Sequence, residues 1–387
     1  MNSILSTACA IGPDASPFEA QPGPRLSVVI PTFNERTNIE ELVRRLDVAL
    51  EDVCWEAIFV DDNSPDGTAE AIRALSQKDH RIRVVHRIGR RGLSTACVEG
   101  MLASAAPYLA VMDADLQHDE TLLLHMYRDL VDDEGLDIVV GSRHVDGGSL
   151  GDWTEDRARM SRFATQLARL VVKADLKDPM SGFFMLRREL LHEAVGKLSG
   201  IGFKILLDIF ASVPRELQFK ERGYTFRTRH SGESKLDSMV AWEYLMMLLD
   251  KTVGRYVPVR FVPFALIGVA GVAVHMTALW VTFKLLGTSF TFGQIVATLI
   301  AMTTNFFMNN ALTYRDRRLR GWGLLTGWLS FTIACSVGAV SNVGIATYLF
   351  TENSVGWVLS AVAGIVVGAV WNYAVTSIYT WNHKSKK

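Results

Sequence analysis

Apolar and polar positions divide the chain into two parts with different patterns. From residue 25 to about residue 250, short apolar runs alternate with segments in which charged and apolar residues are mixed. From Phe261 to Trp381 the chain is strongly apolar, and its apolar segments are much longer. The pattern predicts two domains of different character, which a chain of 387 residues is long enough to form.

The short apolar runs of the first part have the length and composition of buried strands. Helices are expected between them, because Thr37 and Glu40 form a capping-box pattern and Pro65 stands where proline often opens a helix. Alternating strands and helices predict an α/β fold, a parallel sheet covered by helices on both faces. The expected strands are Leu26–Ile30, Ala57–Val60, Arg83–His86, Tyr108–Met112 and Asp137–Gly141.

Four apolar segments in the second part are each long enough to cross a bilayer as a helix. None of them contains Asp, Glu, Lys or Arg, and helices of water-soluble domains are rarely so long and so uniformly apolar. The sequence therefore predicts a transmembrane domain. Its segments are Phe261–Phe283, Leu285–Leu312, Trp322–Phe350 and Val355–Trp381.

Basic residues beside these segments indicate their orientation. Clusters of Lys and Arg precede the first segment, separate the second from the third and follow the fourth, whereas the other two connections contain one basic residue, Lys284. Because short cytoplasmic loops are enriched in Lys and Arg, we expect both termini and the first domain on the cytoplasmic side of the cell membrane. The clusters are Lys251, Arg255 and Arg260; Arg315, Arg317, Arg318 and Arg320; and Lys384, Lys386 and Lys387.

The second and fourth apolar segments end in similar sequences. Asn305–Tyr314 is NFFMNNALTY and Asn372–Trp381 is NYAVTSIYTW, so both contain the pattern N-[FY]-x6-T-[YW]. Aromatic residues that belong at membrane boundaries are one explanation. A tandem duplication of a two-helix unit is the other, and we favour it.

The rest of the composition changes the picture little. The formal net charge of −1 gives no indication of nucleic-acid binding. Four cysteines show neither a C-x-x-C pair nor a disulfide-like spacing, which fits a reducing compartment or simple packing. Residues 1–24 contain four prolines and lack a signal-peptide pattern, so we expect a flexible tail.

Two aspartates and an amide follow the fourth expected strand, namely Asp113, Asp115 and Gln117. On an extended chain, side chains two apart point the same way, so the carboxylates can converge beyond the strand end, where open α/β sheets bind ligands. Oxygen ligands suit Mg²⁺ or Mn²⁺, which usually completes its shell with substrate phosphates. A solvated acidic turn is the alternative. His118 could either ligate the metal or cap the loop.

The loop after the third expected strand, Arg87–Leu93, is RIGRRGL. Gly89 and Gly92 allow a ligand to approach the backbone closely, and the arginines supply positive charge. No G-x-G-x-x-G motif follows the first strand, which disfavours a dinucleotide-binding fold but not a nucleotide crevice.

Eight motifs between Arg25 and Leu236 resemble those of family 2 glycosyltransferases, in the same order, and most closely those of the dolichol-phosphate mannose synthase branch. They are VVIPTFNE, FVDDNSPDGT, RIGRRGL, MDADLQH, GSRHVDGG, DPMSGFFMLRR, GFKILLDI and RHSGESKL. The apolar part resembles the GtrA-like four-helix membrane module more loosely. The resemblance implies a Rossmann-like GT-A nucleotide-sugar domain over residues 25–237, an interfacial amphipathic helix and linker over 238–260, a GtrA-like all-α transmembrane domain over 261–381, and a basic tail over 382–387.

The resemblance also implies roles for individual residues. Asp208 stands where relatives usually have Glu, and we expect it to orient the acceptor or its arginines rather than to act as a general base. Arg162 departs most from the family, because relatives usually have SRGAN where this chain has SRFAT. The donor nucleotide would contact Pro31, Glu35, Asp62, Arg87, Gly92 and Asp113; the metal, Asp113, Asp115 and Gln117; and the acceptor phosphate, Arg143, Arg162 and Arg229. Asp115, these three arginines and Asp208 form the expected catalytic set.

The implied reaction is the inverting transfer of mannose from GDP-mannose to dolichyl or another polyprenyl phosphate. One sugar per turnover is implied, because the Q-x-x-R-W motif of processive relatives is not found. A phosphate monoester is largely dianionic at neutral pH, so the acceptor needs no base, and arginines are needed to bring two anions together. Transfer of glucose from UDP-glucose to undecaprenyl phosphate is an alternative. A lipid-linked sugar translocator with a regulatory first domain is another, and the oligomeric state is left open.

Overall fold

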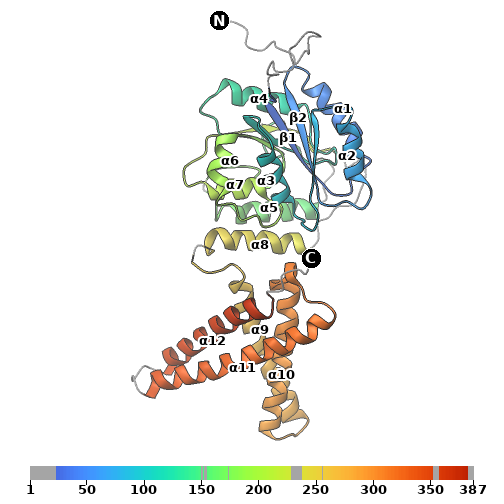
Figure 1. Ribbon diagram of the computed structural model, residues 1–387. Coiled ribbons are helices and arrows are strands. Elements are labelled where there is room, and N and C mark those ends of the chain that lie inside the picture. Colours follow the sequence, from blue (N-terminus) through green and yellow to red (C-terminus); the bar gives the residue numbers. More distant parts are fainter. Residues whose placement is uncertain are drawn as a thin grey trace. The chain divides into compact units, whose positions relative to one another are not determined.

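The structure, a computed structural model, describes residues 23–149, 151, 155–172, 174–227, 238–254, 256–351 and 357–381. The chain forms two units, Met1–Thr252 and Val253–Lys387 (Figure 1). A seven-stranded sheet in the order β3-β2-β1-β4-β6-β5-β7 forms the centre of the first unit. Its strands are β1 (Leu26–Thr32), β2 (Trp55–Asp61), β3 (Ile82–His86), β4 (Tyr108–Val111), β5 (Ile138–Ser142), β6 (Phe184–Arg187) and β7 (Phe219–Gly223).

The expected α/β fold is confirmed, but the sheet is mixed rather than parallel. β1 to β4 run parallel and β5 runs parallel to β7, whereas β6 is antiparallel to both of its neighbours, β4 and β5. The reason lies just before β6. There Gly141 at the end of β5 donates its N–H to the carbonyl of Phe183 at 2.9 Å, and the Ser181 hydroxyl donates to the Gly141 carbonyl at 2.6 Å. Because β6 begins beside the end of β5, it must run back in the opposite direction.

Helices cover both faces of this sheet, because alternate strand residues face opposite sides. In β1, Val28 and Ile30 belong to a core shared with α1, α2 and α4, whereas Val29 belongs to the core on the other face. That second core also includes residues from α3, α5, α6, α7 and α8. These helices are α1 (Ile39–Ala49), α2 (Thr68–Ser76), α3 (Leu93–Ala103), α4 (Leu122–Asp132), α5 (Glu155–Ala168), α6 (Arg188–Val195), α7 (Ile205–Ser212) and α8 (Ser238–Thr252).

Helix α8 packs against the first unit, although residues 238–260 were expected to be an interfacial helix and linker. Tyr244, Met247 and Leu248 are buried in the core, and the Tyr244 hydroxyl donates to the Ala164 carbonyl in α5 at 2.7 Å. The compact first unit therefore extends beyond residue 237, to Thr252.

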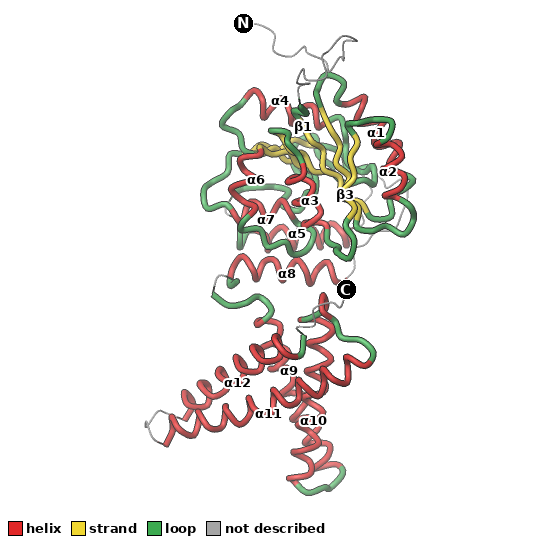
Figure 2. Tube along the Cα trace, in the orientation of Figure 1, coloured by secondary structure: helices red, strands yellow, loops and turns green. Residues whose placement is uncertain are grey.

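The second unit contains the four expected membrane-spanning helices, shown in red in the tube of Figure 2. Two of them have π-helical ends, Trp280–Leu285 after α9 and Asn309–Thr313 after α10, and a 3-10 turn at Arg315–Arg317 follows. The helices are long and apolar enough to cross a membrane. They are α9 (Phe261–Leu279), α10 (Phe290–Met308), α11 (Trp322–Thr351) and α12 (Trp357–Tyr379).

The second unit supports the predicted duplication, since residues 67 positions apart make the same contacts. A side-chain carbon added to Gly271 in α9 would overlap the amide of Asn305 in α10, and one added to Gly338 in α11 would overlap the amide of Asn372 in α12. Glycine thus admits an asparagine side chain into each helix pair.

The ends of α10 and α12 are also equivalent. The N–H of Tyr314 donates to the Asn309 carbonyl at 2.8 Å, and the N–H of Trp381 donates to the Thr376 carbonyl at 3.1 Å. The two rings stack on each other with centroids 4.1 Å apart and an interplanar angle of 4°. The residues that end the two similar sequences therefore meet in one buried cluster of the second unit.

Candidate active site

The predicted donor and metal residues lie at or just beyond the carboxyl ends of β1, β2, β3 and β4. In the register of the sheet, Thr32 at the end of β1 lies beside Asp61 of β2, which lies beside His86 of β3. After β3 the chain crosses to the other side of β1 to form β4. The ligand crevice of an open α/β sheet forms at such a reversal of strand order.

The loop after β1 is held in place by the loop after β2. Three successive backbone N–H groups, those of residues 34–36, donate to the side chains of Ser64, Thr68 and Asp66 at 2.9, 3.1 and 3.3 Å. Ser64 is itself fixed by Asp61, whose carboxylate accepts from the Ser64 N–H at 2.9 Å and from its hydroxyl at 2.6 Å. The segment DDNSPDGT therefore shapes the wall that presents Glu35.

Among the residues that the structure describes, three other than glycine adopt a left-handed backbone, and each lies in a loop that follows one of these strands. They are Asn34 (φ 60°) after β1, Asn63 (φ 58°) after β2 and Leu116 (φ 62°) after β4. This conformation is uncommon for leucine, and such residues cluster at functional sites. Backbone strain is therefore concentrated in the three loops that carry predicted site residues.

Arg87 is buried beneath the glycine-containing loop, with 2% of its surface exposed. Its guanidinium lies 2.9 Å from Asp62 and 3.5 Å from Glu99, and it donates to the Gly92 carbonyl at 3.1 Å and the Thr95 hydroxyl at 2.6 Å. The Asp62 carboxylate accepts the Gly92 N–H at 2.8 Å, and burial raises the pKa of Asp62 despite the neighbouring cation. Arg87 therefore fixes this loop, and the geometry does not support its predicted direct contact with the donor.

Asp113 and Asp115 follow β4, with their side chains exposed to different degrees. The Asp113 side chain is 38% exposed, whereas only 5% of Asp115 is exposed. The Asp115 carboxylate accepts the Gln117 N–H at 3.2 Å, and the Asp113 N–H donates to Nδ1 of His118 at 3.1 Å. His118 therefore caps the loop, one of the two roles considered for it.

The ring of His118 lies in an aromatic cluster. It stacks on Phe183 at 4.9 Å and meets the edges of Tyr224 and Phe226 at 5.8 Å. Burial lowers the pKa of His118 to about 4, so the ring is neutral at physiological pH. Since Nδ1 accepts a hydrogen bond, the proton is on Nε2, which leaves no lone pair for a metal.

The residues after β4 fit a hard divalent cation that takes further ligands from its substrate. Within the described residues, no group of three or more His, Cys, Asp or Glu side chains could hold a metal without such help. A side-chain carbon at Gly182 would lie 3.6 and 3.9 Å from the two Asp113 carboxylate oxygens, so glycine keeps the space beside this carboxylate open. Two carboxylates and the Gln117 amide would then leave room for diphosphate oxygens and water.

Arg143 forms a bidentate ion pair with Asp178. The sequence had predicted no role for Asp178. Nε and Nη2 of Arg143 donate to the two Asp178 oxygens at 2.7 and 2.8 Å, and the Arg143 N–H donates to the same carboxylate at 3.1 Å. Burial by itself would raise the pKa of Asp178, but the Arg143 guanidinium holds that pKa below its ordinary value. Glu221 in turn accepts the Asp178 N–H at 3.1 Å. The only sequence signal for Asp178 was its position in the motif DPMSGFF.

The chain that leads to Arg229 starts beside the loop that carries the predicted metal residues. Gln117 and Arg227 are joined twice: the Gln117 amide donates to the Arg227 carbonyl, and the Arg227 N–H donates to the Gln117 carbonyl, both at 3.0 Å. The Arg227 guanidinium donates to Asp119 at 2.9 Å and Glu120 at 2.6 Å. Arg229 itself lies outside the described residues.

Two predicted catalytic residues are not joined to this site. Arg162 is exposed on α5. Asp208 is fully buried, and its carboxylate accepts the Ser199 N–H at 2.9 Å and hydroxyl at 2.7 Å and the Ser212 hydroxyl at 3.3 Å, and lies 2.6 Å from the Lys251 ammonium. These contacts tie α7 to α8 and to the loop before α7, so Asp208 has a structural role that the sequence did not indicate.

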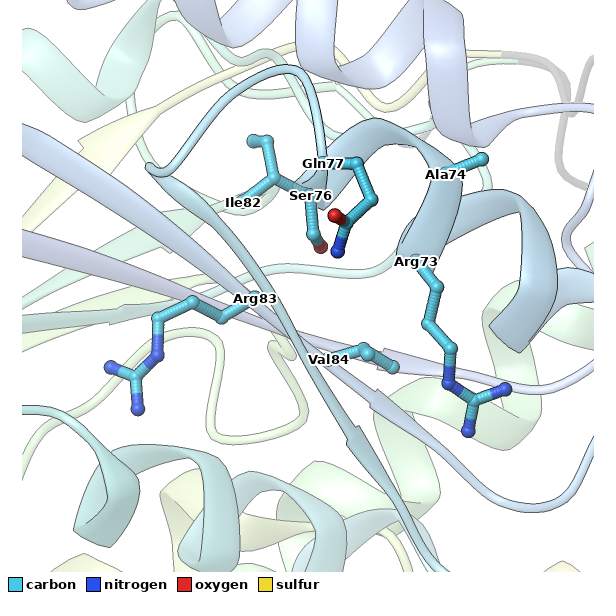
Figure 3. Close-up of a pocket in the computed structure, with 7 residues that line it drawn as sticks. All are labelled: Arg73, Ala74, Ser76, Gln77, Ile82, Arg83 and Val84. Atoms are coloured by element: carbon cyan, nitrogen blue, oxygen red, sulfur yellow. The ribbon is translucent and has the colours of Figure 1, made fainter.

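A cavity of about 530 Å³ in the first unit lies away from these residues, beside the edge strand β3 (Figure 3). The guanidinium groups of Arg73 and Arg83 lie at opposite sides of it, and Arg83 pairs with Glu56 at 2.8 Å. None of the predicted site residues lines the cavity, whose walls are Arg73, Ala74, Ser76, Gln77, Ile82, Arg83 and Val84.

Comparisons with known proteins agree with the division of the chain into a glycosyltransferase-like first unit and a membrane-spanning second unit. Residues 27–194 match the model of glycosyl transferase family 2, and residues 263–381 match the GtrA/DPMS transmembrane domain. The chain is 35% identical to a dolichol-phosphate mannosyltransferase of Pyrococcus furiosus, over 92% of this chain and 99% of that protein. It is 32% identical to a polyprenol monophosphomannose synthase of Mycolicibacterium smegmatis, over 58% of this chain and 86% of that one. Glucosyl-3-phosphoglycerate synthase of Mycobacterium tuberculosis, crystallised with Mn²⁺ and UDP, is a distant structural neighbour, with a TM-score of 0.42 and 20% identity over 59% of this chain and 80% of that one.

Proposed function

The chain belongs to the dolichol-phosphate mannosyltransferase family of membrane glycosyltransferases, and on that premise we propose that it transfers mannose from GDP-mannose to a polyprenyl phosphate at the cytoplasmic face of the cell membrane. The observation that carries the proposal is that a buried arginine, oriented by Asp178, lies near the predicted metal residues after β4. Asp113 and Arg143 are close enough for each charge to influence the other. Such an arrangement suits a reaction between two phosphate-bearing molecules.

In this proposal the donor lies at the ends of β1, β2 and β4. The nucleoside contacts Pro31, Glu35 and Asp62, and their loops are already fixed by hydrogen bonds to neighbouring loops. Loops ordered before binding lose little entropy when the nucleotide enters. Asp113, Asp115 and Gln117 would hold Mg²⁺ or Mn²⁺, which would neutralise charge developing on the leaving diphosphate.

The acceptor phosphate is assigned to Arg143. Its guanidinium is planar, and Asp178 fixes two of its nitrogens, so the plane presented to the acceptor is set before the acceptor arrives. A direct attack by this phosphate on the sugar inverts the configuration and needs no protein nucleophile. Arg229 is a second proposed contact, and Arg162 stays a prediction without support from the contacts on α5.

The first experiment compares donors and acceptors in one matrix. Purified full-length protein in detergent is incubated with GDP-mannose or UDP-glucose and with dolichyl or undecaprenyl phosphate, and glycolipid formation is measured with Mg²⁺ or Mn²⁺. We expect the highest kcat/KM with GDP-mannose, and no product from an Asp115→Asn control. A preference for UDP-glucose would replace the proposed donor. Absence of transfer with every pair would favour the translocator alternative.

The second experiment tests the membrane side. Single cysteines near Gly287 and Asn353, introduced on a cysteine-free background, should react with an impermeant reagent added outside intact cells. A cysteine near Arg318 should react only after the membrane is opened, because the Arg-rich connection is expected in the cytoplasm. The opposite pattern would separate the catalytic domain from cytoplasmic sugar nucleotides and contradict the proposed leaflet.

A further inference from the structure

A cavity of about 340 Å³ lies within the second unit, at the connection between α10 and α11. None of its lining residues is assigned above to the donor, the metal or the acceptor. Its walls combine two arginines with apolar side chains and the beginning of a helix. The lining residues are Phe307, Asn310, Arg318, Leu319, Arg320, Gly321 and Leu324.

The connection that carries the two arginines is anchored in the protein by Asn310, which is 3% exposed. The Asn310 amide accepts the Leu319 N–H at 2.8 Å and donates to the Leu319 carbonyl at 3.3 Å. The indole N–H of Trp381 also donates to the Asn310 oxygen, at 3.2 Å. Because Leu319 is clamped in this way, Arg318 and Arg320 on either side of it project from a fixed backbone.

The charge around the cavity favours an anion. Among the described side chains, no carboxylate forms an ion pair with Arg318 or Arg320, whereas many arginines of the first unit are paired. Gly321 and Leu324, at the beginning of the 30-residue helix α11, also line the cavity. The N-terminal end of a helix carries partial positive charge and backbone donors, which attract phosphate groups.

The cavity also lies at the ends of two candidate membrane spans, where phospholipid headgroups are expected. The span Phe290–Thr313 ends just before the connection, and the span Trp322–Ser341 begins just after it. Phe307 and Leu324 add apolar surface to the same wall, and the exposed Trp322 is an aromatic residue of the type that marks membrane boundaries. Basic pockets between membrane-spanning helices are known to bind anionic headgroups.

The geometry points to a binding site for the phosphate of an anionic phospholipid, held by Arg318 and Arg320, with its acyl chains beside Phe307 and Leu324. The lipid is a structural ligand of the membrane domain and differs from the polyprenyl phosphate substrate. Arginine suits this role because its fork of donors matches two phosphate oxygens at once. The apolar wall distinguishes the site from one that would bind free inorganic phosphate.

The test measures the affinity of full-length protein in nonionic detergent for dihexanoyl phosphatidylglycerol, with dihexanoyl phosphatidylcholine and inorganic phosphate as comparison ligands. We expect saturable binding of phosphatidylglycerol and at least about tenfold weaker binding to the double variant Arg318→Gln/Arg320→Gln, which loses charge-assisted hydrogen bonds. The matched control is Arg315→Gln/Arg317→Gln, which removes the same charge from the same connection but not from the cavity wall. Its affinity should change less than about twofold, because neither Arg315 nor Arg317 lines the cavity.

Three results would overturn the proposal. Equal losses in the two double variants would mean diffuse attraction by a basic loop, and equal binding of phosphatidylcholine would mean that charge is not recognised. Inorganic phosphate that displaces the lipid at equal concentration would identify a free-phosphate site. Arg318→Lys/Arg320→Lys keeps the charge and provides a variant for the case in which the Gln pair does not fold. It should bind more weakly than the wild type, and unchanged affinity would exclude recognition by the guanidinium fork.

Discussion

Replacing Asp178 with Asn would test how the protein orients the proposed acceptor arginine. The substitution preserves the size of the side chain but removes the charge that Arg143 faces through two hydrogen bonds. The amide can also place an N–H₂ group against a guanidinium that has only donors. Asp178 is fully buried and Arg143 nearly so, and neither group can turn to water to compensate.

The expected cost follows from this burial. Removing one partner of a buried ion pair costs about 3–5 kcal/mol, because the remaining charge stays buried without compensation. Part of this loss lowers the stability of the fold. If Arg143 also changes its orientation, acceptor use falls by the value of at least one charge-assisted hydrogen bond, about 1.5–3 kcal/mol, or roughly 10- to 150-fold in kcat/KM for the polyprenyl phosphate.

Asp208→Asn provides the matched control. Asp208 is also fully buried and lies 2.6 Å from the ammonium of Lys251, so its substitution breaks a second buried ion pair in the same unit. Both variants should lower the thermal midpoint of the full-length protein in detergent, but only Asp178→Asn should selectively raise KM for the acceptor. Nucleotide binding, titrated with metal and without lipid, should be nearly unchanged in both.

The reasoning fails if Asp178→Asn loses stability but keeps the acceptor kinetics of the wild type, because Arg143 would then not depend on Asp178 for its orientation. A selective loss of acceptor use in Asp208→Asn would instead restore the catalytic role predicted for Asp208 from the sequence. The double variant Arg143→Met/Asp178→Leu separates the two effects. It should recover much of the stability, since apolar pairs can replace buried ion pairs, while acceptor use stays low.

Other predictions concern the metal loop and its support. Asp115→Asn should abolish transfer, EDTA should do the same to the wild type, and Mg²⁺ or Mn²⁺ should restore only the wild type; full activity in chelator would contradict a metal site. Gly182→Val should fill the space beside Asp113 and weaken metal-dependent nucleotide binding, whereas equal affinity in both proteins would show that nothing binds there. Stability should fall as the pH drops from about 6.5 to about 4, by at most about 3 kcal/mol, because unfolded His118 takes up a proton that the buried ring, with its pKa near 4, does not. This pH dependence should disappear in His118→Gln, and its persistence in thermal unfolding would mean that other groups cause it.

The sequence was sufficient to predict β1 to β5, including the edge strand β3, but not β6 or β7. β1, β2 and β4 each contain an uninterrupted apolar run, namely VVI, AIFV and YLAV, so their positions were visible in the sequence. β7 (Phe219–Gly223, FKERG) is an edge strand of the sheet, and its charged residues hide it from an apolar pattern. β6 has four residues within a longer motif, and its reversed direction depends on contacts of Ser181 that a pattern of strands and helices does not contain.

The same limit applies to the predicted site residues. Asp113 and Asp115 were predicted because their spacing on a single strand end is local information. Arg87 and Asp208 were assigned ligand or catalytic roles from their motifs, but each is paired with groups from other parts of the chain, such as Glu99 and Lys251. A charged residue in a motif has the same sequence pattern whether it contacts a ligand or an internal partner, and the internal partners become visible only in the structure.

In the membrane domain, the two halves make equivalent contacts although their sequences have diverged. Few positions of the two halves are identical, yet contacts between the halves are reciprocal: Phe264 meets Tyr373 with ring centroids 5.5 Å apart, and their counterparts Phe331 and Phe306 meet at 5.8 Å. Reciprocal contacts of this kind require a two-fold relation between the halves. Because each half contains two helices, both halves cross the membrane in the same direction, and the axis must run along the membrane normal. The stacked rings of Tyr314 and Trp381 lie where such an axis would pass, since each is the counterpart of the other. A single chain thus reproduces the symmetry of a dimer of two-helix units.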